Sequence, residues 1–232
     1  MGGDRDAARL LTALGAHMLT GRHGAGAHLV AAPAASEQGR PKEVYRKDYA
    51  PPEFLIPAVS LHFTLGVGDE STIVKAALSC ERVGSIGAPL VLDGEGLDLL
   101  SLCIDGVAVP ASGYTISNET NASTTLTIAA AALPAATSFT VETTVEIFPA
   151  SNHQGDGLYM SAETFVTQCE PQGFRRITFH QDRPDILSVY TVTVDGDTKA
   201  CPVLLSNGNR VDQGEAEGRH FITFLDPFPK PT

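Results

Sequence analysis

The chain has 232 residues, and its content of 43% hydrophobic and 19% charged residues is ordinary for a globular protein with one large β-domain or two small ones. A net charge of −11 argues against a nucleic-acid partner, because nucleic-acid surfaces need clustered Lys and Arg. No apolar run is long enough to span a bilayer, so we also expect no membrane partner.

The first segment, residues 1–44, is rich in Ala, Gly, His and Arg and has no strand pattern. Two arginines precede four apolar residues on one helical face: Arg5 and Arg9, then Leu10, Leu11, Leu14 and Met18. This pattern is typical of a transit peptide, whereas Asp4 and Asp6 count against targeting. A disordered extension and a transit-peptide-like extension both remain open. The first predicts a cytoplasmic protein and the second an organellar one, in a chloroplast or mitochondrion.

The rest of the chain, residues 45–232, has the pattern of β-strands. Three segments alternate strictly between apolar and polar residues, which predicts strands with one buried face. Their buried positions are Val59, Leu61, Phe63 and Leu65, then Val74, Ala76, Leu78 and Cys80, and then Phe139, Val141, Thr143, Val145 and Ile147. Further strands are predicted at 99–104, 124–128, 176–179, 188–194, 203–205 and 220–225.

Three dipeptides are typical of hairpin turns, because Asp-Gly and Asn-Gly tolerate the positive φ that type I′ turns require. They are Asp105-Gly106, Asp195-Gly196 and Asn207-Gly208. Short strands separated by such turns predict an all-β fold, built from curved, sandwich-like antiparallel sheets.

The metal-ligating residue types show no ligand pattern. The seven histidines are scattered, with no HExxH motif, so we expect no metal site in this chain. The four cysteines, Cys80, Cys103, Cys169 and Cys201, form no CxxC pair. Their even number leaves a disulfide framework possible, but a chain of this size does not require one, and we favour a reducing compartment.

One candidate binding pair lies in the stretch TQCE. If this stretch is extended, Gln168 and Glu170 point to the same side, with their acceptor oxygens ~7 Å apart along the chain. An amide oxygen and a carboxylate suit a primary ammonium group, which has only donors.

The stretch that comes next, FRRITFHQDRPD, has the pattern of a structural segment. Asp182 is predicted to cap a short helix whose first turn contains Pro184. Arg175, Arg176 and Arg183 are predicted to pair with nearby carboxylates.

Four segments together resemble the N-terminal domain of the aminopeptidase N (alanyl aminopeptidase) family of zinc metallopeptidases. They are RKDYAPPEFLI, APLVLDGEGLDLLS, GLYMSAETFVTQCEPQGFRRITFHQDRPD and the stretch from PVLLSNGNRVDQGE to DPFPKPT. They occur in collinear order over residues 45–232, and TQCEPQGFRRITFHQDRPD followed by LLSNGN and DPFPKP is highly specific.

The resemblance implies a function for the candidate pair. In this family the residues that match Gln168 and Glu170 help to bind the free α-amino group of a peptide substrate. Full-length family members hold zinc at an HExxH…E site beyond a GAMEN segment, downstream of this point. None of these motifs occurs here, so we expect the chain alone to bind no zinc and to be inactive, with the missing catalytic domain as its partner.

The resemblance also implies that the β-domain is incomplete at its C-terminal edge, because the family continues with another strand of the same domain. Two alternatives remain open. The chain could be a non-catalytic binding or interaction module derived from such an enzyme, or it could come from an incomplete gene model. Reading the transcript past Thr232 for an in-frame HExxH would distinguish them.

Overall fold

A computed structural model describes residues 45–68, 70–118 and 123–232. The chain divides into two units between Tyr49 and Ala50. The described part of the first unit contains one 3₁₀ turn, η1 (Arg46–Asp48), and the second unit comprises residues 50–232. The extension predicted for residues 1–44 lies outside the described residues.

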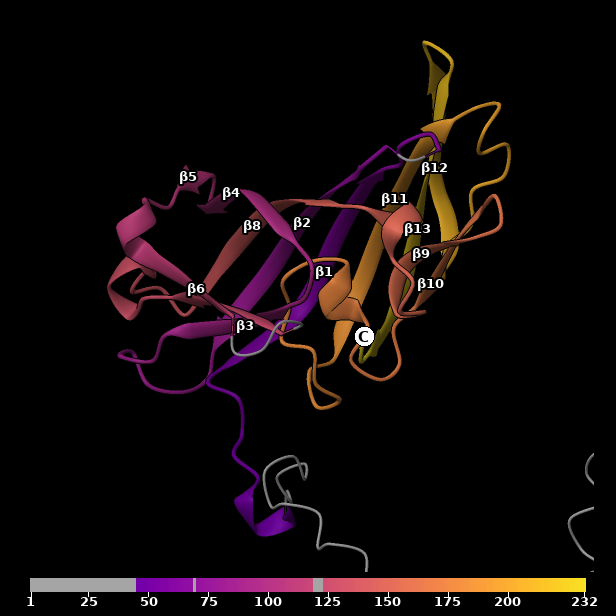
Figure 1. Ribbon diagram of the computed structural model, residues 1–232. Helices are drawn as coiled ribbons and strands as arrows, with labels where there is room; N and C mark the ends of the chain where they lie inside the picture. Colours follow the sequence, from indigo (N-terminus) through magenta and orange to yellow (C-terminus); the bar gives the residue numbers. More distant parts are fainter. Residues whose placement is uncertain (1–44, 69, 119–122) are drawn as a thin grey trace, which may run out of the picture. The chain divides into compact units, whose positions relative to one another are not determined.

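The second unit is built around one eight-stranded sheet with the strand order β12-β13-β11-β1-β2-β8-β4-β5 (Figure 1). In chain order its strands are β1 (Phe54–Thr64), β2 (Thr72–Arg82), β4 (Asp98–Ile104), β5 (Val107–Ala108), β8 (Ser138–Ile147), β11 (Ser188–Asp197), β12 (Asn209–Ala216) and β13 (Arg219–Lys230).

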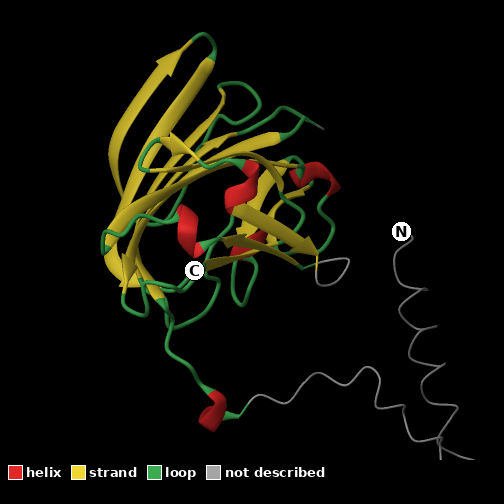
Figure 2. Cartoon of the chain, turned by 90° about the vertical axis from the view of Figure 1, so that its left-hand side faces the viewer, coloured by secondary structure: helices red, strands yellow, loops and turns green. Residues whose placement is uncertain are grey.

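Two smaller sheets accompany it. A three-stranded sheet contains β3 (Leu90–Gly94), β6 (Tyr114–Asn118) and β7 (Thr124–Ile128), and a two-stranded hairpin contains β9 (Gly157–Ser161) and β10 (Thr164–Gln168). The connections contain four short 3₁₀ turns: η2 (Ala111–Gly113), η3 (Ala130–Ala132), η4 (Pro149–Ser151) and η5 (Phe174–Arg176). Figure 2 shows strands making up most of this unit, and in the described part of the chain no helix is long and apolar enough to cross a membrane.

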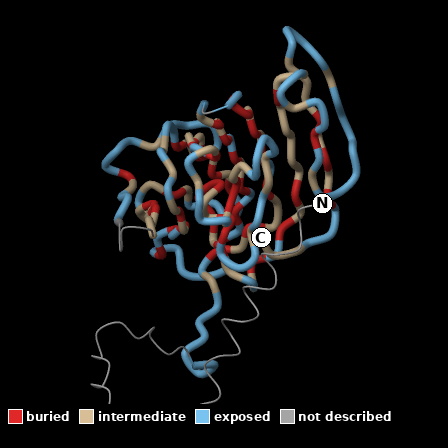
Figure 3. The backbone as a smooth tube through the Cα atoms, turned by 45° about the vertical axis from the view of Figure 1, so that its right-hand side comes forward, coloured by how far each residue is buried: buried red, intermediate tan, exposed pale blue. Residues whose placement is uncertain are grey.

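The predicted all-β class is confirmed, and the strict alternation explains the core. All the apolar positions predicted for β1, β2 and β8 are buried, and they share one hydrophobic cluster with residues of the three-stranded sheet such as Leu90, Leu126 and Ile128. In Figure 3 many of the buried segments gather toward the middle of the folded chain. The two sheets therefore enclose a common core, as expected for a sandwich-like arrangement.

One strand pair departs from the predicted antiparallel arrangement. β1 and β11 are parallel, from Ala58 beside Val189 to Thr64 beside Asp195. A parallel pair cannot be joined by a tight turn, so its two strands come from distant parts of the chain. Alternation along one strand carries no information about the direction of its neighbour, which is why the sequence does not reveal this pair.

Two predicted strands are wrong. Residues 176–179 leave the 3₁₀ turn η5 without entering a strand, and Ile177, Thr178 and Phe179 are all buried rather than alternating. Residues 203–205 form a loop in which Val203 and Leu205 are exposed. The first prediction rests on only four alternating residues (RITF) and the second on a three-residue apolar run (VLL), and patterns this short do not by themselves distinguish strands from packed loops.

Of the three predicted turns, only Asp105-Gly106 is a hairpin turn, with positive φ at both residues between β4 and β5. Asp195-Gly196 lies inside β11, where Asp195 pairs with both β1 and β13 and Gly196 pairs with β13. Asn207-Gly208 lies in a bend before β12 and joins no two strands. The turn between β12 and β13 is Glu217-Gly218, also with two positive φ values, and its first residue is not the Asn or Asp on which the prediction depends.

The C-terminal strand is not simply an edge. β13 lies between β12 and β11, but β12 pairs with it only from Arg219 to Leu225. Within the described residues, the later part of β13 pairs with β11 alone, ending with Lys230 beside Ser188. Among the described strands, β12 is the edge of the sheet on this side, and the end of β13 beyond Leu225 adds a short open stretch to it.

Candidate functional site

The candidate pair lies where the β9–β10 hairpin ends. The two strands pair from Ser161 beside Thr164 to Gly157 beside Gln168, so Gln168 is the last residue of β10. The chain then leaves the strand, and Glu170 belongs to a turn that contains the cis peptide bond Glu170–Pro171. Glu170 is not part of the extended strand, so the alternation of side chains along a strand does not explain its orientation.

The structure nevertheless brings Gln168 and Glu170 together. The side-chain Nε2 of Gln168 donates a hydrogen bond to the backbone carbonyl of Glu170, at 2.6 Å. Both residues are exposed, so the Glu170 carboxylate and the Gln168 amide oxygen are accessible to a ligand. Because one N–H of the amide is engaged with the turn, the amide oxygen remains as an acceptor and the second N–H as a donor.

The turn that carries Glu170 is closed by Gly173. Its backbone N–H donates to the carbonyl oxygen of Cys169 at 2.7 Å. A Cβ atom on Gly173 would lie 2.4 Å from the carbonyl oxygen of Gln168 and 3.1 Å from the Cα of Cys169. Glycine is thus required for close backbone approach, and the turn is packed directly against the end of β10.

Two arginines beyond the turn bind carboxylates, as predicted. Arg175 donates from Nε to Asp182 at 3.1 Å, and the Asp182 backbone N–H donates to Asp93 of β3 at 3.1 Å. Arg176 pairs with Glu95, which lies just after β3. The Asp182–Asp93 hydrogen bond and the Arg176–Glu95 pair therefore tie the site segment to the three-stranded sheet, over a long distance in sequence.

The third arginine, Arg183, pairs with Asp185 at 2.5 Å, also as predicted. The helix predicted to begin at Asp182 is absent, because residues 183–185 form a bend and turn. The Asp182 carboxylate, only 2% exposed, instead accepts from the backbone and side chain of Arg175 and from the Thr232 hydroxyl. Long-range partners thus replace the local cap that the sequence suggests.

Sequence reasoning missed three residues behind the site: Asp93, Glu95 and His180. Burial raises the pKa of Asp93, and the Arg175 guanidinium opposes this shift. His180 is completely buried, with its ring edge-on to Phe174 at 5.1 Å between centroids. Asp93 and His180 also exchange backbone hydrogen bonds. No local pattern indicates such partners, because they come from distant parts of the chain.

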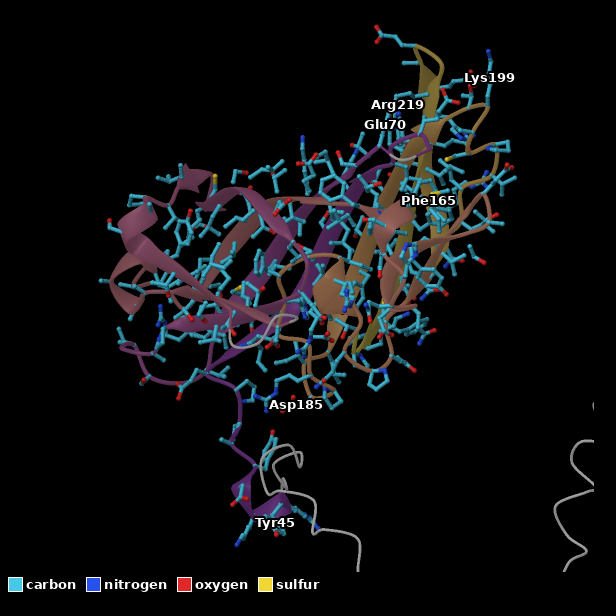
Figure 4. All side chains as sticks on the ribbon, in the orientation of Figure 1. Tyr45, Glu70, Phe165, Asp185, Lys199 and Arg219 are labelled. Atoms are coloured by element: carbon cyan, nitrogen blue, oxygen red, sulfur yellow. The ribbon has the colours of Figure 1, made fainter. Side chains whose placement is uncertain are left out.

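The other face of the hairpin lines a cavity of about 480 Å³ beside the large sheet. Phe165, Thr167 and Cys169 contribute from the site segment, and Tyr190 and Val192 contribute from β11. Figure 4 labels Phe165 on β10. Burial and the carboxylates of Asp182, Glu170 and Asp156, in that order, raise the pKa of the Cys169 thiol to about 11. Burial is the largest cause of this shift, and the smaller contributions of the three carboxylates indicate a negative potential around the turn.

No metal centre emerges from the described residues, which contain no group of three or more His, Cys, Asp or Glu side chains that could hold an ion. All four cysteines are free thiols rather than disulfides. The chemistry available at the candidate site is therefore that of hydrogen-bond acceptors and negative charge.

Comparison with known proteins identifies the relatives of this chain. The family model described as the peptidase M1 N-terminal domain matches residues 89–232. Aminopeptidase N from Caulobacter vibrioides is 46% identical over 193 residues, which cover 83% of this chain and 21% of that protein. Aminopeptidase N from Escherichia coli is 40% identical, with the same coverage. The chain thus spans about a fifth of the length of these relatives.

Solved structures lead to the same family. The crystal structure of Legionella pneumophila aminopeptidase A in complex with aspartic acid is 32% identical, with a TM-score of 0.70, over 80% of this chain and 21% of that one. A mutant M1 zinc metallopeptidase from Deinococcus radiodurans, bound to a Tyr-Ser-Ala substrate, is 20% identical with a TM-score of 0.61, over 77% of this chain and 40% of that one. The second likeness shows the fold alone.

Proposed function

Since the chain belongs to the peptidase M1 family, whose N-terminal domain it matches, we propose that it holds the free α-amino group of a peptide for an aminopeptidase. The observation that carries this proposal is the link between Gln168 and Glu170 at the end of β10. Relatives solved with a peptide substrate or an amino acid support a peptide partner.

The chemistry of the site suits an ammonium group. An α-ammonium has three donors and no acceptor, and the exposed pair offers a carboxylate and an amide oxygen. A hydrogen bond between two charged groups is shorter and stronger than a neutral one. A fixed carboxylate would therefore retain a charged chain end and reject an internal peptide bond, which carries no such charge. That preference is what distinguishes an aminopeptidase from an endopeptidase.

The negative potential around the turn supports the same role. The carboxylates that raise the pKa of Cys169 include Glu170 itself. A region of one charge sign attracts the opposite charge and increases its local concentration. Glu170 would make the direct contact, while Asp156 would add to the attraction without touching the ligand. Asp182 would contribute little, because Arg175 already pairs with it.

Zinc is implied by the family, but the donor set in the described residues does not fit it. We therefore assign no step to zinc in this chain and predict that the purified chain holds no stoichiometric zinc and hydrolyses no aminoacyl substrate. Three pre-positioned ligands are the least that catalytic zinc sites use. Elemental analysis after exhaustive dialysis is the measurement, and one tightly held zinc per chain would contradict the prediction.

The amine-binding role can be tested in a chimera. The domain replaces the 193 matched residues of the Caulobacter aminopeptidase N, and Glu170→Ala is compared with the unmodified chimera. We expect kcat/KM for peptides with a free N-terminus to fall roughly 30- to 1,000-fold, because a charge-assisted contact is lost. This factor corresponds to a loss of ~2–4 kcal/mol in transition-state stabilisation. Gln168→Ala should cost less, because the acceptor that it removes is neutral.

The matched control is Glu163→Ala, which removes an exposed carboxylate from the tip of the same hairpin. It should leave kcat/KM unchanged. If kcat/KM of the Glu170→Ala chimera stays within about threefold of the unmodified chimera, a difference well under 1 kcal/mol, the amine-binding role is refuted. A folded but inactive unmodified chimera would instead favour a non-catalytic binding module.

A further inference from the structure

Arg176 packs against the turn that carries Glu170. We propose that Arg176, through its ion pair with Glu95, is a positioning residue that sets where the Glu170 carboxylate lies. This inference rests on the proposed amine-binding function, and it adds a residue that does not touch the ligand.

The first step is the contact between β9, the turn and Arg176. Gly157, which pairs with Gln168, has φ +72, and a Cβ there would lie 2.4 Å from the Cβ of Arg176 and 3.2 Å from the carbonyl oxygen of Gly173. The backbone N–H of Arg176 also donates to that carbonyl oxygen at 3.1 Å. Arg176 therefore packs against both the end of the hairpin and the closure of the turn.

The second step is the anchor of Arg176 itself. Its guanidinium binds Glu95, between β3 and β4, and the backbone N–H of Glu95 donates to the carbonyl oxygen of Arg175 at 2.9 Å. The side chains of Arg176 and Glu95 are only 19% and 17% exposed. Solvent screens such a pair less than a surface pair, and removing one partner leaves a charge without compensation. The turn is thereby fixed relative to the three-stranded sheet.

The neighbouring pair, Arg175 with Asp182, has a different role. Asp182 is almost fully buried and accepts three hydrogen bonds, two from Arg175 and one from Thr232. Its loss would disturb the fold as a whole. Arg176 and Glu95 lie nearer the surface, so their interaction can be removed while the fold is kept.

The first experiment is amide hydrogen exchange on the chain itself, comparing it with the Glu95→Gln variant. We expect the Gly173 amide, which closes the turn, to exchange at least about tenfold faster in the variant. The amide of Leu78, a fully buried residue in the centre of the large sheet, should change little. A purely structural role would instead accelerate both amides together.

Two comparisons sharpen this experiment. Arg176→Gln and the double variant should match Glu95→Gln, because removing the second partner of a broken pair has no further effect on the turn. Asp195→Asn is the control, since it breaks another ion pair on the domain, the more exposed pair of Asp195 with Arg219, at 2.8 Å. Arg219 lies near Glu70 and Lys199, at the end of the domain opposite Asp185 (Figure 4). The control variant should leave Gly173 exchange unchanged.

The second experiment measures kinetics in the chimera, with matched substrates that carry or lack the α-amino group. Glu95→Gln should reduce kcat/KM about tenfold for the amine substrate and hardly at all for the des-amino analogue. Equal losses on both substrates, or unchanged Gly173 exchange, would overturn the inference.

The failures are distinguishable. If Glu170→Ala has no kinetic effect while Gly173 exchange accelerates in Glu95→Gln, the positioning of the turn stands and the proposed function falls. If Glu170→Ala reduces kcat/KM but Glu95→Gln changes neither exchange nor substrate preference, the proposed function stands and the positioning role falls.

Discussion

Burial disfavours the protonated, charged form of the His180 side chain. It is completely buried, and neither ring nitrogen has a hydrogen-bond partner of ordinary geometry among the described residues. Burial lowers its pKa from 6.5 to about 4, although the Gln181 backbone and the Asp182 carboxylate oppose the shift. The folded protein therefore holds His180 neutral across a pH range in which an unfolded chain would protonate it.

This shift predicts a pH dependence of stability. Between pH 6.5 and pH 4 the unfolded chain binds the proton more readily, so the free energy of unfolding should fall as the pH falls through this window. By pH 4 the loss in the free energy of unfolding should be on the order of 3 kcal/mol, and above pH 7 there should be no such loss. Urea unfolding of the chain and of His180→Phe, at several pH values, measures it.

The variant comparison isolates His180 from Asp93, whose raised pKa acts in the opposite direction. A carboxyl group with a raised folded pKa contributes stability as the pH falls, because the folded state then binds the proton more readily. His62→Gln, on the half-buried face of β1, is the control and should keep the pH slope. An equal slope in the chain and in His180→Phe would show that His180 is not responsible.

At the scale of the element, the β9–β10 hairpin offers a test of close packing. Gly155 and Gly157 both have positive φ, +76 and +72, but only at Gly157 would an added Cβ atom have neighbours within 4 Å. Alanine at either residue meets the same backbone penalty. At Gly157 it must also displace Arg176 and Gly173, so we expect Gly157→Ala to lose about 1–3 kcal/mol more than Gly155→Ala.

Thermal and urea unfolding of the two variants measure this difference. Equal stability losses would mean that the space behind Gly157 is not closed in solution. In the chimera, Gly157→Ala should also weaken amine selectivity, because the end of β10 that carries Gln168 is its direct neighbour in the hairpin.

The strands show where sequence reasoning works. Alternation of apolar and polar residues follows directly from burial of one strand face, so the positions that it predicts as buried in β1, β2 and β8 are all buried. The predicted bounds of β7 also agree with the structure. Asp195-Gly196 shows the limit. The turn propensity of this dipeptide is outweighed by the pairing of Asp195 with both neighbouring strands and of Gly196 with β13, and the Asp195 carboxylate accepts a hydrogen bond from Arg219. Gly196 allows close approach of Cys201 instead of a turn.

The candidate site is predictable in residue type but not in geometry. Gln168 and Glu170 stand out by their chemistry and by the family resemblance, and their hydrogen bond places them together. Their binding of an amine stays a prediction. The sequence indicates that Arg175 and Arg176 need carboxylates, but not that Asp182 and Glu95 are the partners, since that choice depends on how two sheets pack.

At the scale of the whole β-domain, the cavity beside the hairpin predicts dye binding. Its lining includes Leu61, Phe63, Val192 and Val194 from β1 and β11, and a mostly apolar cavity of about 480 Å³ is within the usual size range for small ligands. We expect a hydrophobic dye such as anilinonaphthalene sulfonate to bind the folded chain with enhanced fluorescence.

Val192→Asp should remove most of this fluorescence, because it places a charge in the cavity wall. Val189→Asp, on the same strand and equally half-buried but not part of the lining, is the matched control. Fluorescence that persists in Val192→Asp and disappears in Val189→Asp would place the dye elsewhere on the domain.

The parallel pair of β1 and β11 has a consequence for how the molecule reaches its fold. Among the described strands it is the only pairing that joins β11, β12 and β13 to the rest of the large sheet, and β1 and β11 lie far apart in the chain. Closing so long a loop costs conformational entropy before any contact between β1 and β11 compensates for it. Domains rich in contacts between distant parts of the chain fold in ~ms to s. We expect this junction to form last and to set the folding rate. Destabilising changes at the junction should therefore slow refolding, and changes in the β12–β13 hairpin, whose local contacts form before the junction, should also slow refolding rather than speed unfolding.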